Sequence, residues 1–314
     1  MANRIAVVGS NMVDLVTYVN RMPGPGETLE APRFEMGPGG KGANQAVAAA
    51  RLGSKVVMVS KVGDDVFGQN TIRNFESLGI DARHVGIVPG TSSGVAPIFV
   101  EPSGENSILI IKGANSHLLP ADVDAAADDL LGCDLILLQL EVPLETVYHT
   151  IAFAGRHGKQ VLLNPAPATP ELELAKLRDV TFFTPNRGEL ALLTGLPTDT
   201  LGQIETAARK LLDVGIRTVI ATLGSDGVLL VTREGAQHVQ AVKVQPVDTT
   251  GAGDAFIGSF AHFYTRGHDV TDALHWAVRY AAQSVTQRGT QKSYADAAGF
   301  RTFCAGIGDG APPA

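Results

Sequence analysis

Two glycine-rich segments of the chain each lead into an apolar helix pattern and carry polar side chains that could do chemistry. The later segment, residues 247–260, reads VDTTGAGDAFIGSF. Gly251, Ala252 and Gly253 are small residues that open the helix, so their N–H groups would point together and form an anion hole. Asp254 follows in the first turn, where it could accept a proton from an alcohol while those N–H groups hold a phosphoryl group. The alternative is that Asp254 only stabilises the positive end of the helix dipole.

The earlier segment, residues 36–53, reads MGPGGKGANQAVAAARLG and is open to three interpretations. Free N–H groups at the start of a helix suit the phosphates of a nucleotide, the pyrophosphate of a dinucleotide, or a ligand without phosphate. The dinucleotide fingerprint fails because the first strand pattern lies far upstream and no acidic residue closes the second strand. A Walker A loop fails because Lys41 is followed by Gly42 rather than by serine or threonine. A purely structural turn would explain the glycines, but it leaves Lys41 and Asn44 unexplained.

Short apolar runs rich in β-branched residues alternate with helical patterns along most of the chain. This alternation is typical of an α/β fold, with a mostly parallel sheet covered by helices on both faces. The predicted strands are Ile5–Val8, Lys55–Val59, Leu135–Gln139, Gln160–Leu163, Val180–Thr184 and Thr218–Thr222. The predicted helices are Ala43–Leu52, Phe67–Leu78, Leu144–His157, Arg187–Leu193, Gln203–Val214, Ala252–Tyr264 and Val270–Thr286.

Residues 16–36 and 94–112 interrupt the alternation and read as extended segments joined by turns such as PGPGE and PSGEN. Because a few antiparallel strands cannot form a stable domain alone, we expect them to make a small flap beside the main sheet. An active-site lid is a natural use of such a flap. A later pair, Val228–Thr232 and His238–Val244, predicts another hairpin at the sheet edge.

Length and composition narrow the class of protein. The chain has 314 residues, with 25 Lys and Arg against 32 Asp and Glu, and a formal net charge of −7. We expect one α/β domain over residues 1–304 and a disordered tail over 305–314. An acidic chain argues against nucleic acid or an anionic membrane as the main partner. Cys133 and Cys304 fit neither a disulfide framework nor zinc-site spacing. With no signal-peptide pattern and no apolar run of about 18 residues, we expect a cytoplasmic protein.

Motifs along the chain resemble, in order and spacing, those of the ribokinase-like sugar kinases, the PfkB family. The early GGKGANQAVAAARLG and the late DTTGAGDAF look like the two signatures of that family. Between them, in register, lie KVGDDVFG, GAN, QLEVPLE, NPAPA, PNRGE and TLGSDG. The resemblance covers residues 4 to about 300. It implies a three-layer α/β/α fold with a small antiparallel β lid, and an ATP-dependent sugar kinase that forms a homodimer through the lid.

The resemblance assigns the early motif to the sugar rather than to the nucleotide. It implies that Gly40, Lys41 and Asn44 hydrogen-bond the sugar hydroxyls. It adds Asp14, from the end of the first strand, and Glu141 to the same group. Convergent polar side chains of fixed geometry are what a sugar site requires. The late motif would then carry the phosphoryl chemistry, with Asp254 as the catalytic base beside its anion hole.

The resemblance also implies a nucleotide side. Asn186 and Glu189 match the family's Asn-x-x-Glu, which acts on the phosphate and Mg²⁺ side, and Glu189 would act through water because Mg²⁺ usually keeps water ligands. The implied nucleotide contacts are Thr222, Gly224, Ser225 and Gly227. A monovalent cation, usually K⁺, is implied beside the anion hole at Asp248, Thr250, Ser284, Gln287, Gly289 and Ser293.

One position departs from the ribose-phosphorylating members of the family, which read Gly-Ser-x-Asn-x-Asp where this chain reads GSNMVD at residues 9–14. Asp14 is kept, but Met12 stands where the sugar-binding Asn would be. Asn11 cannot substitute, because in an extended segment a shift of one residue points the side chain to the opposite face. Methionine offers apolar volume and no hydrogen bond. The resemblance implies that the missing Asn would serve the 2-hydroxyl of ribose, and GSNMVDLVTY and TSSGVAPIFV look most like the members that phosphorylate 2-deoxyribose. Together these imply transfer to the 5-hydroxyl of 2-deoxy-D-ribose, with residual activity on ribose.

Alternatives remain within this interpretation. Met12 could simply fill the core, in which case ribose is the substrate. A nucleoside or hexose kinase is a more distant possibility within the same enzyme class. From another class, a sugar-binding sensor without catalysis would fit the sugar motif, but the intact Gly253, Asp254 and Glu189 argue against it.

Overall fold

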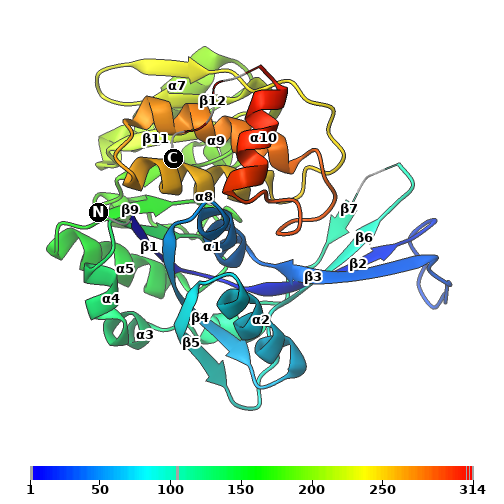
Figure 1. Cartoon of the computed structure of the whole chain (residues 1–314). Coiled ribbons are helices and arrows are strands. Elements are labelled where there is room, and N and C mark those ends of the chain that lie inside the picture. Colours follow the sequence, from blue (N-terminus) through cyan, green and yellow to red (C-terminus); the bar gives the residue numbers. More distant parts are fainter. Residues whose placement is uncertain (1–2, 104–105, 309, 311, 313–314) are drawn as a thin grey trace.

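The computed structural model describes residues 3–103, 106–308, 310 and 312, and its strands form two sheets (Figure 1). The larger sheet contains β1 (Arg4–Val8), β4 (Lys55–Gly63), β5 (Asp81–Val88), β8 (Leu135–Leu138), β9 (Gln160–Leu163), β10 (Phe182–Phe183), β11 (Thr218–Thr222), β12 (Val228–Val231) and β13 (Ala236–Val239). The smaller sheet contains β2 (Met12–Tyr18), β3 (Arg33–Gly39), β6 (Val95–Val100) and β7 (Asn106–Ile108).

Ten α-helices and three short 3₁₀ helices lie in the described residues. The α-helices are α1 (Lys41–Arg51), α2 (Val66–Ser77), α3 (Pro120–Ala125), α4 (Ala127–Leu131), α5 (Leu144–Arg156), α6 (Arg187–Thr194), α7 (Leu201–Val214), α8 (Ala252–Thr265), α9 (Val270–Ser284) and α10 (Ala297–Gly306). The 3₁₀ helices are η1 (Gly113–His117), η2 (Leu174–Leu177) and η3 (Gly224–Asp226). None of the helices in this part of the chain is both long and apolar enough to cross a membrane.

The larger sheet has the strand order β13-β12-β11-β10-β9-β8-β1-β4-β5. Strands β5 to β11 pair in parallel, and only β12 and β13 at one edge pair antiparallel. Its central strands are buried throughout, as the near-continuous apolar runs predict. Because side chains alternate between the faces, each central strand supplies two separate cores. Helices α1, α2, α8, α9 and α10 cover one face, and α3 to α7 cover the other, which confirms the three-layer prediction (Figure 1).

Every predicted strand and helix of the main sheet is present, within a few residues of its predicted bounds. Patterning missed strand β5 and helices α3, α4 and α10, and the edge hairpin ends earlier than predicted, with β13 stopping at Val239. Helix α10 continues through Gly306, two residues into the segment predicted as a tail, of which residues 309, 311, 313 and 314 lie outside the described residues.

The small sheet projects from the side of the main body, at the right of Figure 1, and has the order β3-β2-β6-β7. Its outer pairs are antiparallel, as expected, whereas the central pair β2–β6 is parallel. Strand β2 begins at Met12 rather than at residue 16, so the lid grows directly from the end of β1. Strand β3 ends at Gly39 and the chain enters α1 at Lys41. The lid is therefore joined without a long linker to the two segments predicted to bind the sugar.

Helices α1 and α8 pack in close contact on one face of the main sheet (Figure 1). A Cβ atom at Gly258 would lie 2.4 Å from the backbone oxygen of Gln45 and 2.6 Å from Cβ of Ala48. Only glycine fits at such a separation, because real Cβ contacts do not come so close. This contact sets the distance between the first turn of α1 and the first turn of α8, where Asp254 lies.

Replacing Gly258 with alanine is expected to push α1 and α8 apart and to lower the free energy of unfolding by about 1–3 kcal/mol, the usual cost of overpacking. Gly202→Ala is the matched control, because a Cβ there meets nothing within 4 Å on the exposed start of α7. It should change stability by less than about 1 kcal/mol. Urea denaturation of both variants measures this difference, and equal stabilities would contradict the packing described.

Candidate functional site

The first turn of α1 lies against the junction of β1 and β2. Gly40 precedes the helix with φ of 86°, and a Cβ there would lie 2.6 Å from the Met12 backbone nitrogen. Positive φ and lack of space together require glycine at this point. The backbone N–H of Lys41 donates to Oε2 of Glu141 at 2.9 Å, and the Ser10 hydroxyl donates to the same oxygen at 2.5 Å. A carboxylate therefore satisfies the start of α1, which holds Gly40, Lys41 and Glu141 together.

Asp254 lies in the first turn of α8 and is only 8% exposed. Its Oδ2 accepts a hydrogen bond from Nδ2 of Asn44 at 2.9 Å, and its Oδ1 accepts one from Nε2 of Gln45 at 3.0 Å. The two glycine-rich motifs are 210 residues apart in the sequence. Their side chains nevertheless meet directly, so the predicted sugar group and the predicted base share one site.

Four charged side chains converge here. Burial, then the neighbouring Glu141 carboxylate, raises the pKa of Asp14 to about 7. Burial also raises the pKa of Glu141 and of Asp254, while Lys41 opposes the rise in both. Burial would lower the pKa of Lys41, but Asp254 and Glu141 outweigh it and keep this ammonium charged. One cation among three carboxylates, of which Glu141 and Asp254 are buried and Asp14 is half-buried, makes a polar site suited to a ligand rich in hydroxyls.

The predicted anion hole begins the same helix. Ala252 is the first helical residue, and its N–H donates to the Thr249 oxygen at 3.2 Å. Gly253 and Asp254 are the next two residues, whose N–H groups have no partner within a helix at this position. The Tyr294 hydroxyl fixes the position of Gly251, because it donates a hydrogen bond to the Gly251 oxygen at 2.9 Å. The first turn of α8 thus presents its amides beside a buried carboxylate.

The predicted nucleotide residues follow the carboxyl ends of β10 and β11. Asn186 and Glu189 form a reciprocal cap on α6, in which each side chain accepts a 2.8 Å hydrogen bond from the other residue's N–H. Burial raises the pKa of Glu189, and the same carboxylate raises the pKa of Lys41, which places it at the edge of the charged group. Thr222 pairs with Asn186 in a parallel bridge. The turn that follows contains the remaining three predicted contacts, with Gly224 and Ser225 exposed and Gly227 buried.

The predicted cation residues come from two segments that lie side by side. The N–H of Val247 donates to the Val285 oxygen at 2.7 Å. Asp248 accepts hydrogen bonds from the N–H groups of Thr250 and Gly289, each at 2.9 Å. The hydroxyls of two of the predicted residues donate to nearby backbone oxygens, Ser284 to Ala281 and Ser293 to Thr290. Gln287 joins this turn through its N–H, which donates to the Ser284 oxygen at 3.4 Å.

This set of oxygen donors suits a hard cation better than a transition metal. In the described part of the chain, no three His, Cys, Asp or Glu side chains cluster as a metal site of that kind requires.

Met12 is 2% exposed and packs with Ala96 and Ile98 at the base of the lid. The Asn11 side chain points the other way, as the alternation along an extended segment predicts. Its Nδ2 donates to the Ser60 hydroxyl at 2.8 Å and to the Lys61 backbone oxygen at 2.7 Å. Asn11 therefore ties β1 to β4 and leaves the Met12 position without an amide.

Sequence reasoning missed some residues of this site. Gln45 stands beside Asn44 in the early motif, but it was not expected to reach Asp254. The Ser10 hydroxyl donates to the Glu141 carboxylate, and the Tyr294 hydroxyl donates to the Gly251 backbone oxygen. Thr290 reaches Asp14 at 3.5 Å, and Gln291 donates to Oδ1 of Asn44 at 3.0 Å. Only Gln45 carried a signal in the sequence, because it is a polar residue next to Asn44 in an otherwise alanine-rich helix pattern.

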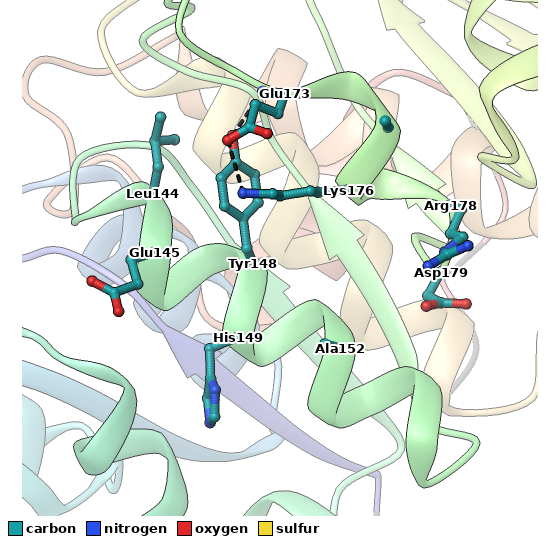
Figure 2. Close-up of a pocket in the computed structure, with 10 residues that line it drawn as sticks. Leu144, Glu145, Tyr148, His149, Ala152, Glu173, Lys176, Arg178 and Asp179 are labelled. Atoms are coloured by element: carbon teal, nitrogen blue, oxygen red, sulfur yellow. Dashed lines mark hydrogen bonds and ion pairs between the residues drawn. The ribbon is translucent and has the colours of Figure 1, made fainter.

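A surface groove of about 570 Å³ lies elsewhere, between α5 and the segment that contains η2, and none of the predicted site residues lines it (Figure 2). Lys176 lies over the ring of Tyr148, at 4.6 Å from its centroid, and pairs with Glu173 at 2.8 Å. The Tyr148 hydroxyl in turn accepts the Glu173 N–H at 2.7 Å. Lys176, Glu173 and Tyr148 thus bind one another, and the groove is separate from the group of charged side chains around Asp254.

Known proteins share this combination of fold and motifs. Residues 2–297 match the model of the pfkB family carbohydrate kinases. The chain is 60% identical to the deoxyribokinase of Salmonella typhi over 290 residues, which cover 92% of this chain and 95% of that protein. It is 40% identical to the ribokinase of Schizosaccharomyces pombe over 299 residues, 92% of this chain and 94% of the other.

Among solved structures, Arabidopsis thaliana ribokinase complexed with ribose and ATP superposes with a TM-score of 0.91 at 30% identity, covering 96% of this chain and 99% of that one. The ribokinase-like fold inferred from the motifs is thus confirmed. The family match and the level of identity both extend over nearly the whole chain, so this protein belongs to the pfkB family of carbohydrate kinases.

Proposed function

We propose that this protein transfers the γ-phosphoryl group of ATP to the 5-hydroxyl of 2-deoxy-D-ribose, giving 2-deoxyribose 5-phosphate. The observation that carries the proposal is the 60% identity to a deoxyribokinase, against 40% to a ribokinase over a similar length. Met12 supplies the physical reason, because a buried thioether side chain suits a carbon that has no hydroxyl. Ribose would leave a polar hydroxyl facing that apolar group, a modest penalty that allows residual activity.

Asp254 is the base that accepts the proton of the attacking 5-hydroxyl. Burial raises its pKa above the usual aspartate value, which makes the carboxylate a stronger base for the hydroxyl proton. Its Oδ1 and Oδ2 are each held by one amide, so the carboxylate has a fixed direction. The amides of Gly253 and Asp254 at the start of α8 stabilise the negative charge of the phosphoryl group in transfer.

The sugar lies beside the start of α1, under the small lid. Lys41, Asn44 and Asp14 bind its hydroxyls, with Gly40 and Glu141 fixing the position of this turn. Closure of the lid strands over the sugar would exclude water and limit ATP hydrolysis.

ATP binds along the carboxyl ends of β10 and β11, next to Asn186, Thr222, Gly224, Ser225 and Gly227. This placement draws support from the similarity to a ribokinase whose structure contains ribose and ATP. When bound, Mg²⁺ would neutralise charge on the phosphates. The Glu189 carboxylate would bind it through a water ligand. We place the reaction in the cytoplasm, where ATP is available.

K⁺ binding is the remaining part of the site. Two backbone N–H groups fix the Asp248 carboxylate between the segments at Thr250 and Gly289. The backbone oxygens of these segments, with those around Ser284, Gln287 and Ser293, would bind K⁺ next to the start of α8. A cation there would strengthen the positive potential of the anion hole.

A homodimer through the lid accounts for apolar side chains that the monomer leaves exposed. Phe34 is 58% exposed and Leu109 is 61% exposed, and Met36 and Ile111, which the strand register places on the same face of the small sheet and its continuation, are also exposed. An apolar face of this kind on a projecting sheet is typical of a protein–protein contact. Pairing of two lids would cover it.

Met12→Asn is expected to lower the ratio of kcat/KM for 2-deoxyribose to kcat/KM for ribose by about tenfold or more, because it adds a hydrogen-bonding group where the ribose 2-hydroxyl would lie. The wild type should prefer 2-deoxyribose by up to about 10²-fold. Met12→Leu keeps an apolar side chain and should keep the preference. A wild type that prefers ribose would contradict the proposal, and an unchanged ratio in Met12→Asn would remove Met12 from it.

Asp254→Asn should lower kcat by about 10³-fold or more while calorimetry still detects sugar binding, because the amide keeps the shape but cannot accept the proton. Asp213→Asn, on the exposed face of α7, is the control and should behave as wild type. Turnover of Asp254→Asn near the wild-type rate would show that another group is the base.

The dimer has its own test. Phe34→Glu combined with Leu109→Glu should give a monomer in size-exclusion chromatography with light scattering, because the charges prevent burial of the lid faces. Leu201→Glu changes an exposed leucine on α7 in the same way and should leave the wild-type mass. A wild type that is already monomeric at micromolar concentration would contradict the lid contact.

A further inference from the structure

Two consecutive residues of α1 hold the carboxylate of Asp254. Asn44 donates to one oxygen and Gln45 to the other, at 2.9 and 3.0 Å. Neighbours in a helix point about 100° apart, so both can reach one carboxylate only if it lies between their directions. The close packing of α8 on α1 at Gly258 provides this position. Asn44 also belongs to the proposed sugar group, whereas Gln45 is fully buried behind it.

The orientation of the Gln45 amide is fixed by two further amides. Gln139 Nε2 donates to Oε1 of Gln45 at 2.7 Å, so that oxygen cannot face Asp254. Gln45 Nε2 also lies 3.4 Å from Oδ1 of Asn164, whose own Nδ2 donates to the Thr184 oxygen at 2.9 Å. If the Gln45 side-chain amide were flipped, its N–H would face the N–H of Gln139. Its oxygen would face the oxygens of Asp254 and Asn164, so both contacts would be repulsive.

This arrangement of amides leaves one buried oxygen without a hydrogen bond. The Oε1 atom of Gln139 is buried and has no hydrogen-bond partner among the described residues. It faces Gly9, where a Cβ would lie only 2.1 Å from it. An unsatisfied buried carbonyl destabilises a protein, so its presence needs an explanation. The other end of the same amide supplies one: Gln139 gives its N–H to Gln45 and thereby turns the Gln45 N–H toward Asp254.

We propose that Gln45, oriented by Gln139 and Asn164, is a positioning residue that holds Oδ1 of Asp254, so that the carboxylate stays aimed at the sugar hydroxyl. This inference rests on the proposed function in one respect, the role of Asp254 as base. Amides suit the task because they carry no charge and do not titrate in the working pH range. The two amide donors therefore stay unchanged across the working pH range.

Several ionisable groups around Asp254 also influence its pKa. Burial raises its pKa, and the Lys41 ammonium, then the amides of Asn44 and Gln45, lower it. The carboxylates of Asp14, Glu141 and Glu189, and the Tyr294 hydroxyl, are the other ionisable groups coupled to it. A hydrogen bond to the ionised form favours that form. Loss of the Gln45 donor should therefore raise the pKa of Asp254. The Lys41 ammonium, the three carboxylates and the Tyr294 hydroxyl would be unchanged.

The test compares the wild type with Gln45→Met, which keeps the length of the side chain and removes the amide. The primary readout is the ¹³C NMR titration of the Asp254 carboxyl carbon, assigned with Asp254→Asn, in the full chain without substrate. Gln45→Met should raise the pKa of this carboxyl by about one unit. Gln139→Met should raise it by less, because it frees the Gln45 amide to turn without removing it.

The second readout is the steady-state kinetics with the pentose that the wild type uses better. Gln45→Met should lower kcat about tenfold or more with less than about a threefold change in sugar KM, and it should move the acid limb of the kcat/KM profile upward. Asn3→Leu is the control, since it removes a buried amide that contacts Ser54 and His262 at the far end of α8. It should leave both the titration and the profile unchanged.

An Asp254 titration that is the same in wild type, Gln45→Met and Gln139→Met would overturn the inference. So would a shift that Asn3→Leu reproduces, because that would indicate a general effect of lost stability. A wild type that phosphorylates neither pentose would contradict the proposed function instead, and the NMR titration would still decide the role of Gln45. If Gln45→Met does not fold, the Gln139→Met titration decides it.

Discussion

The burial of one carboxylate, Asp254, at the contact of two helices is the constraint on which the rest of the site depends. A buried carboxylate is unfavourable unless hydrogen bonds and opposite charge compensate it. Here the compensation comes from α1, which supplies two amides and the Lys41 ammonium. The start of α1 must therefore lie against the start of α8, and glycine at 258 allows it. The proposed sugar-binding residues and the proposed base are coupled because α1 contacts Asp254 directly.

The same helix start connects the site to the lid. The chain passes from β1 through Met12 into β2, and returns through β3 and Gly40 into α1. A residue at the root of the lid can therefore act on sugar selection without belonging to the phosphoryl chemistry. Met12 is proposed to be such a residue, since it packs on the lid strand β6 and its backbone lies against Gly40 at the start of α1. In this account substrate preference comes from the lid root, and catalysis comes from α8.

Much of the fold could be predicted from the sequence, because continuous apolar strands and amphipathic helices alternate with clear periods. Strand β5 escaped prediction because at the sheet edge its polar and apolar residues are mixed. The parallel pairing of β2 with β6 also escaped, since no local pattern encodes which strands of a lid become neighbours. In the site, motif resemblance gave the residues that are proposed to face ligands. It did not give Gln45, Gln139 or Asn164, whose contacts depend on tertiary packing between α1, β8 and β9.

We propose above all that the protein is a kinase of 2-deoxyribose in which the apolar side chain of Met12 disfavours ribose. A direct competition measures this: equimolar 2-deoxy-D-ribose and D-ribose with limiting ATP, Mg²⁺ and K⁺, and both sugar phosphates quantified by mass spectrometry at early times. The account predicts that 2-deoxyribose 5-phosphate is the main product, with a smaller amount of ribose 5-phosphate. Ribose 5-phosphate as the main product, or no phosphorylation of either sugar, would contradict it.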